Sequence, residues 1–101
     1  MPDKTVSTVL WTDRALRNAS SIKKYLEINF STREVENFYS LLHAFEIAIS
    51  AFPNLYPKSK IKRRIRRAVL SKVLSVYYRI SKNRIEVLAL LDNRCDISKW
   101  L

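Results

Sequence analysis

The sequence predicts one α+β domain in which two helices, packed as an antiparallel hairpin, cover one face of a small, mainly antiparallel four-stranded sheet. Three observations predict this fold: an initial segment rich in β-branched residues, two consecutive amphipathic helical patterns, and a set of apolar segments near the C-terminus. The expected element order is β-α-α-β-β-β. The chain has 101 residues and no repeat or linker, so residues 1–101 are expected to form a single domain.

The N-terminal half of the chain predicts one strand and both helices. Residues 5–11 (TVSTVLW) favour a strand because β-branched side chains dominate the segment. Apolar residues then recur at three- and four-residue spacing up to about Ile28, after caps offered by Thr12 and Asp13. A capping box, Ser31 with Glu34, is expected to start the second helix, and Pro53 ends it. The connecting turn is very short, so the helices must pack side by side.

The C-terminal half predicts a loop at residues 53–60 and then an antiparallel meander. In its middle strand, residues 74, 76, 78 and 80 share one face, and residues 73, 75, 77 and 79 share the other. Asn83 is the residue expected to take a positive φ in the following turn, because the chain has no glycine. The last strand is the most uniformly apolar, which indicates a central place in the sheet. The three strands are expected at residues 65–70, 73–80 and 85–91.

Positive charge is the strongest compositional signal. The chain has 19 lysine and arginine residues against nine aspartate and glutamate residues, a formal net charge of +10 and a pI near 10.1. Seven of the cations lie in residues 58–67, KSKIKRRIRR. Such a run repels itself, which favours an anionic partner: nucleic acid, a ribonucleoprotein surface or an acidic protein segment. The alternative is a solvated loop or a nonspecific polybasic signal.

Other features of the composition exclude several classes of function. Phosphate-cradling loops need glycine so that backbone can approach the phosphate, and this chain has none, so we expect no nucleotide cofactor. A lone histidine, His43, and a lone cysteine, Cys95, cannot build a metal site. One cysteine and the absence of an apolar run near ~20 residues favour a cytoplasmic protein that does not enter the membrane.

The uncovered face of the sheet is the expected binding surface. Arg79 falls there by alternation, beside Ser75 and Tyr77. Tyr77 could stack on a base or could be a half-buried strand aromatic. Arg66, Arg67, Arg79 and Arg94 are expected to converge on this face, where only an anion would compensate them. The alternative for Arg94 is a local ion pair in the turn that contains Asp92.

Several motifs, in this order, resemble the RelE/ParE superfamily of bacterial type II toxins, which includes plasmid stabilisation proteins. The motifs are W-T-D after the first strand, F-P-N-L-Y-P after the second helix, R-R-A-V-L-S-K, V-Y-Y-R-I and the closing L-L-D-N-R-C-D. Their order and spacing cover the chain from about Val6 to Asp96. The resemblance implies a growth-inhibiting toxin that is neutralised by an antitoxin lying over a basic groove, in a toxin–antitoxin hetero-oligomer.

Two targets follow from this resemblance. The RelE-like branch cleaves messenger RNA in the ribosome, and the ParE-like branch inhibits DNA gyrase without being a nuclease. Carried over by position, Arg66 or Arg67 matches the arginine of the second strand, and Arg94 matches the arginine after the last strand. A RelE-like enzyme places a tyrosine about six residues later, where this chain has Trp100. Indole neither gives nor takes a proton near neutral pH, so the choice between an RNA-binding nuclease and a non-enzymatic inhibitor stays open.

The candidate site combines both lines of reasoning. The catalytic candidates are Arg67 and Arg94. The alternative to a toxin is a non-toxic basic nucleic-acid-binding domain. The candidates for contact with nucleic acid or antitoxin are Lys60, Lys62, Arg63, Arg64, Arg66, Lys72, Tyr77, Arg79 and Trp100.

Overall fold

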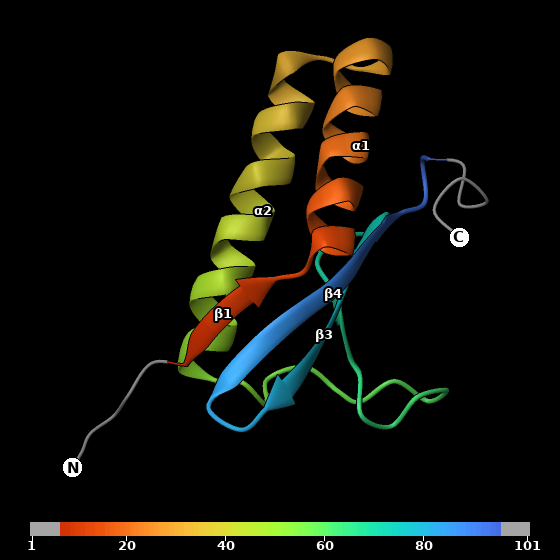
Figure 1. The fold of residues 1–101 in the computed structure, drawn as a ribbon. Helices are drawn as coiled ribbons and strands as arrows, with labels where there is room; N and C mark the ends of the chain where they lie inside the picture. Colours follow the sequence, from red (N-terminus) through yellow and green to blue (C-terminus); the bar gives the residue numbers. More distant parts are fainter. Residues whose placement is uncertain (1–6, 96–101) are drawn as a thin grey trace.

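The computed structural model describes residues 7–95, and it confirms the predicted α+β architecture. Two antiparallel helices lie over one face of a four-stranded sheet (Figure 1). Within the described range, no helix is both long enough and apolar enough to cross a membrane. The elements in chain order are β1 (Thr8–Trp11), α1 (Asp13–Asn29), α2 (Thr32–Ala51), β2 (Arg66–Val69), β3 (Leu74–Ser81) and β4 (Arg84–Asp92).

The sheet has the strand order β1-β4-β3-β2. The β2, β3 and β4 strands form the predicted antiparallel meander, and β1 adds to β4 in parallel. The last strand is therefore central, as its uniformly apolar sequence predicted. The β2 strand is an edge strand of four residues, shorter than the six predicted at 65–70.

The helices begin and end close to where the sequence placed them. Thr12 caps α1, and its Oγ accepts the N–H of Ala15 at 3.2 Å. Ser31 is the N-cap of α2, but its side chain makes no capping hydrogen bond, so the predicted capping box is wrong. Glu34 instead pairs with Arg94, which lies 60 residues later. The α2 helix ends at Ala51, shortly before Pro53.

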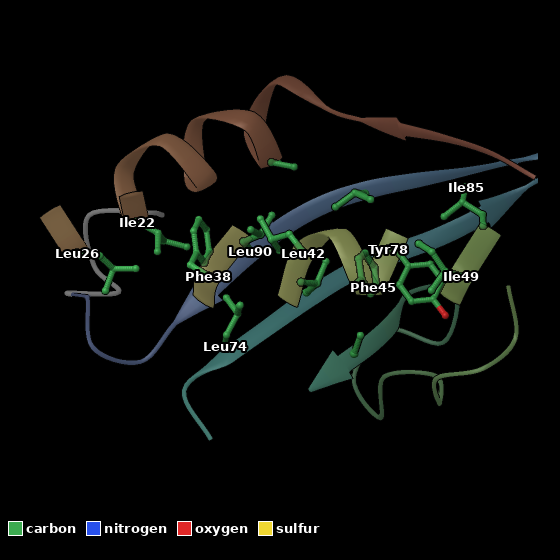
Figure 2. Packing of buried hydrophobic residues seen from close by; sticks show 14 residues of the cluster. Ile22, Leu26, Phe38, Leu42, Phe45, Ile49, Leu74, Tyr78, Ile85 and Leu90 are labelled. Carbon is green, nitrogen blue, oxygen red and sulfur yellow. The ribbon is translucent and has the colours of Figure 1, made fainter. Parts of the chain in front are cut away.

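The core lies between the helices and the covered face of the sheet (Figure 2). Each large apolar side chain that is fully buried stabilises the fold by roughly 1.5–3 kcal/mol. Tyr78 is fully buried there, and its hydroxyl donates to the carbonyl of Pro53 at 2.8 Å. Burial raises the pKa of Tyr78. The largest fully buried apolar side chains are Tyr78, Phe38, Phe45, Ile22, Leu26, Ile49, Leu74, Ile85, Leu90, Val76 and Val87.

A β-bulge interrupts β4, and the side chains of Thr12 and Asn18 form hydrogen bonds with the backbone around it. The register changes between Tyr77 and Tyr78, which pair with Ala89 and Val87, so Leu88 is the extra residue. The Oγ of Thr12 donates to the carbonyl of Val87 at 2.9 Å. The buried side chain of Asn18 accepts the N–H of Leu90 at 3.0 Å. These polar residues therefore hold α1 on the irregular part of β4.

The β3–β4 turn corrects one prediction. Lys82, at φ 52°, has the positive φ that was expected for Asn83, and it is the only described non-glycine residue with one. Ser81 pairs with Arg84, so Lys82 and Asn83 form a two-residue hairpin loop. The turn types that fit such loops require a positive φ at the first central residue. The geometry of the hairpin therefore overrides the preference of asparagine for this conformation.

Candidate functional site

The basic run forms a projecting hairpin, which we call the basic finger (residues 57–67). Lys58 bridges to Arg66 in antiparallel fashion. The N–H of Ser59 donates to the carbonyl of Ile65 at 2.7 Å, and the N–H of Arg67 donates to that of Pro57 at 3.0 Å. The finger leads into β2, whose first two residues it includes, and extends away from the helices as the green loop in Figure 1. The sequence predicted a loop that ends at Lys60, but the whole run is one structural unit.

The tip of the finger is ordered by local hydrogen bonds. The Oγ of Ser59 accepts the N–H groups of Ile61 at 3.2 Å and Lys62 at 3.4 Å. The N–H of Ile65 donates to the carbonyl of Lys62 at 3.0 Å. The backbone groups of this turn are engaged in local hydrogen bonds, and the side chains of the tip, residues 60–64, are exposed. Four predicted contact residues lie here: Lys60, Lys62, Arg63 and Arg64.

A cationic pocket of about 520 Å³ lies between the finger and the end of β3. Five positively charged side chains line it, and its lining contains no carboxylate, histidine or cysteine. This composition suits the binding of phosphate or carboxylate groups and supplies no group for proton transfer near neutral pH. The lining residues are Lys58, Arg63, Arg64, Arg66, Arg79, Ile80 and Ser81.

The pocket exists because β2 is short. The β2 strand pairs with residues 75–78 of β3, so residues 79–81 have no β2 partner. Their backbone edge therefore faces the pocket, beneath the finger. An unpaired strand edge offers N–H and C=O groups to an extended chain. The pocket thus combines a strand edge with concentrated positive charge.

Arg66 belongs to the pocket but not to the open face of the sheet. It pairs with the buried Tyr78, so its side chain lies on the helix side. Its guanidinium donates from Nη1 to the carbonyl of Tyr56 at 2.7 Å and from Nη2 to Oδ1 of Asn54 at 2.9 Å. These bonds fix both the arginine and the loop after α2. The prediction that Arg66 shares a face with Arg67 is therefore wrong.

The open face carries the other predicted residues of β2 and β3. Arg67 pairs with Tyr77, which is partly exposed, and its Nη2 lies 3.4 Å from Oγ of Ser75. Arg79 follows on the same face, two residues after Tyr77. The alternation predicted for β3 is thus confirmed.

Arg79 is partly neutralised on this face. Its Nε donates to Oε1 of Glu86 at 2.6 Å, and Arg84 lies 3.1 Å from the other oxygen. The bond from Arg79 lowers the pKa of the Glu86 carboxyl. Glu86 therefore remains ionised to lower pH than an ordinary glutamate and holds two arginines at the rim of the surface.

Arg94 lies elsewhere and is bound to carboxylates. Its Nε and Nη2 donate to the two oxygens of the fully buried Asp92 at 3.0 and 2.8 Å, and its Nη1 donates to Glu34 at 2.9 Å. The ring of Phe30 lies 5.2 Å from its Cζ. The bond to Asp92 raises the pKa of Arg94. Arg94 therefore joins the end of β4 to the start of α2, and the predicted convergence of four arginines is wrong.

Lys72 and Arg94 are separated from the pocket. Lys72 is exposed in the connection between β2 and β3, at the opposite end of that hairpin. Asp92 pairs with Leu74 at the same end, five residues along β3 from Arg79, or roughly 17 Å. Trp100 lies outside the described residues.

The sequence contained a signal for this site that local motifs did not reveal. Between Ile47 and Ile85 there is no aspartate or glutamate, and this segment holds 11 of the 19 lysine and arginine residues. Its formal charge is +11, whereas the remainder of the chain carries −1. The distribution of carboxylates, rather than the density of cations, is what marks the finger and the pocket.

A second surface is apolar and lies along the two helices. A groove of about 280 Å³ there includes Leu16, Tyr39 and the exposed His43. Nε1 of Trp11 donates to Glu46 at its edge, at 2.8 Å. Among residues 7–95, no three His, Cys, Asp or Glu side chains cluster so as to hold a metal ion.

The comparisons with known proteins give structural neighbours. No protein-family model and no curated sequence matches the chain. Twelve chains of solved structures match, and three of them are the following. The chromosomal ParDE TA system from P. aeruginosa gives a TM-score of 0.73 at 12% identity, over 86% of this chain and 96% of that one. The conserved hypothetical protein HP0894 from Helicobacter pylori gives 0.54 at 14%, over 87% and 96%. The E. coli DinJ-YafQ toxin-antitoxin complex gives 0.53 at 10%, over 87% and 93%.

These neighbours agree with the resemblance that the sequence motifs indicated. At 10–14% identity they establish the architecture and not the activity. Coverage of 93–96% of each neighbour leaves no large element of those folds missing here. The chain therefore shares its fold with these three solved structures.

Proposed function

We propose that this protein is the toxin of a type II toxin–antitoxin module. The observation that carries the proposal is the cationic pocket, in which five positive side chains meet and, among residues 7–95, only Arg79 has a carboxylate partner, Glu86. Two of the structural neighbours are described as a ParDE toxin–antitoxin system and a DinJ-YafQ toxin-antitoxin complex, which supports a protein partner for this fold. A pocket lined by positive charges on a small basic domain attracts an anionic occupant.

The antitoxin is proposed to bind through an extended acidic segment. Such a segment can pair with the free edge of β3 at residues 79–81 while its carboxylates reach Arg63 and Arg64. Ion pairs across this surface would speed association and determine the register of the segment. The apolar groove along the helices offers a second contact, for an apolar face of the same partner.

We propose that the toxin inhibits its target by binding, and that the target is DNA gyrase. Two observations favour binding over RNA cleavage: the pocket lining lacks a group that could transfer a proton, and Arg94 is engaged by two carboxylates. The competing function is ribosome-dependent cleavage of messenger RNA, in which Arg67 would stabilise charge on the phosphate. The remaining alternative is a basic nucleic-acid-binding domain without toxicity.

The proposal is tested by expression followed by two target assays. Induction of this chain alone is expected to arrest bacterial growth, and a co-expressed acidic protein from the adjacent open reading frame is expected to restore it. The purified chain is expected to inhibit supercoiling by gyrase and to leave translated messages intact. Cleaved messages with unaffected gyrase would establish the ribonuclease instead. Unhindered growth would favour the remaining alternative, a basic nucleic-acid-binding domain without toxicity.

A further inference from the structure

The tip of the basic finger presents an isolated apolar side chain. Ile61 is 90% exposed, more than any other exposed large hydrophobic residue in the described part of the chain. Its backbone is held in the turn because its N–H donates to Oγ of Ser59. An exposed isoleucine contributes little to folding, so the stability of the domain gives no reason for this side chain at this position.

The surroundings of Ile61 are entirely cationic. Lys60 and Lys62 flank it in the chain, and Arg63 and Arg64 complete the exposed tip. None of these four side chains makes a salt bridge within residues 7–95. The tip therefore combines one apolar side chain with four uncompensated charges on a two-stranded base.

From this arrangement we infer that the finger binds double-stranded DNA, with the cations on phosphates and Ile61 placed against the bases. The inference goes beyond the proposed toxin function and does not depend on it. A two-stranded ribbon fits the major groove of B-form DNA, which is about 12 Å wide, and not the narrow major groove of A-form RNA. In the major groove, a single apolar side chain can also contact the exposed methyl group of thymine.

A protein partner would suit this tip less well. Protein interfaces depend on clusters of apolar side chains that bury one another, with charge at the rim. Ile61 has no exposed apolar neighbour in residues 60–64. Contact with one base step needs only one side chain, whereas docking on an apolar protein surface or in a lipid bilayer needs several.

The two components of this binding have different salt dependence. Each phosphate that a cation neutralises adds about 0.9 to the slope of log affinity against log salt concentration. Apolar contact releases no counterions, so it leaves that slope unchanged. Substitution of Ile61 and substitution of a neighbouring lysine should therefore produce distinguishable defects.

The experiment measures binding of the full-length chain to a labelled 20-base-pair DNA duplex at several salt concentrations. Ile61→Ala is expected to weaken binding about tenfold at every concentration, with the slope unchanged. Lys62→Ala is expected to lower the slope by about 0.9. Ile28→Ala is the matched control, since Ile28 is also exposed, at 71%, but lies near the turn between the helices. It should bind as the unaltered chain does. All three positions are exposed, so folding is preserved.

Several outcomes would overturn the inference. Equal binding by Ile61→Ala and the unaltered chain would mean that the tip binds DNA only through nonspecific electrostatic contacts. Tighter binding to single strands or to duplex RNA of the same sequence would exclude the DNA groove as the site. An Ile61-dependent affinity confined to an acidic peptide or to vesicles of anionic lipid would assign the tip to those partners instead.

Discussion

The two ends of the β3–β4 hairpin use arginine in opposite ways. At the end that contains Asp92, Arg94 is engaged by two carboxylates and covered by Phe30. At the other end, Arg63 and Arg64 line a pocket without any carboxylate. The same side chain therefore stabilises the fold at one end and is available to a partner at the other. The difference is decided by which carboxylates lie within reach.

This comparison explains why residue type alone misassigned Arg94. The turn after β4 looked like a source of positive charge for a phosphate site. Asp92, only two residues away, and Glu34, 60 residues away, instead neutralise the guanidinium. A buried carboxylate needs a counter-charge, so Asp92 and Arg94 depend on each other.

Arg94→Ala is expected to have the largest effect. It leaves the buried carboxylate of Asp92 without its counter-charge, which should lower the free energy of unfolding by roughly 3 kcal/mol. Urea denaturation at pH 7 measures this. Arg94→Lys, which retains the charge but not the two-pronged contact, should lose less. Full stability together with loss of toxicity would indicate that Arg94 acts in the functional site and does not stabilise the fold.

Arg66→Ala is expected to have an intermediate effect. It removes two hydrogen bonds from a charged group to Tyr56 and Asn54, at a cost of about 1.5 kcal/mol. The adjacent Arg67→Ala is the matched control, because Arg67 lies on the opposite face and has one long contact with Ser75. Its stability should change by about 0.5 kcal/mol or less. Equal losses in both variants would contradict the assignment of their faces.

Glu86→Gln is expected to have a small effect that depends on pH. The folded state lowers the pKa of Glu86 from its ordinary value of 4.5, mainly through the bond from Arg79. The ionised form therefore stabilises the fold fully above about pH 4.5 and loses this contribution as pH falls through the lower folded pKa. The difference in urea midpoint between Glu86→Gln and the unaltered chain should shrink toward zero below that pH. A constant difference would show that the ion pairs contribute nothing.

The double change of Arg63→Ala and Arg64→Ala is expected to alter stability least. Both side chains are exposed and have no carboxylate partner among residues 7–95, so the unfolding free energy should stay within about 0.5 kcal/mol. Binding of the antitoxin should nevertheless weaken by about tenfold or more, as measured by calorimetry at low salt. Unchanged antitoxin affinity would remove the pocket from the interface.

Much of the fold followed from local periodicity. The α2 helix was predicted by its apolar spacing, and the two faces of β3 by alternation, because burial of one face imposes a period on the sequence. The basic finger was missed because residues 53–65 have no such period. Its hydrogen bonds join Pro57 and Ser59 to residues that follow the tip, and a charge run of this kind usually marks disorder or solvated chain.

The sequence by itself determined the order of the elements, the central place of β4 and the excess of positive charge, since each depends on composition or short-range pattern. Only the tertiary structure decided where that charge is free. The register of β2 against β3 placed Arg66 on the helix side, and the meeting of Arg94 with Glu34 removed it from the site. Such pairings depend on contacts between distant segments, and no local property of either partner encodes them.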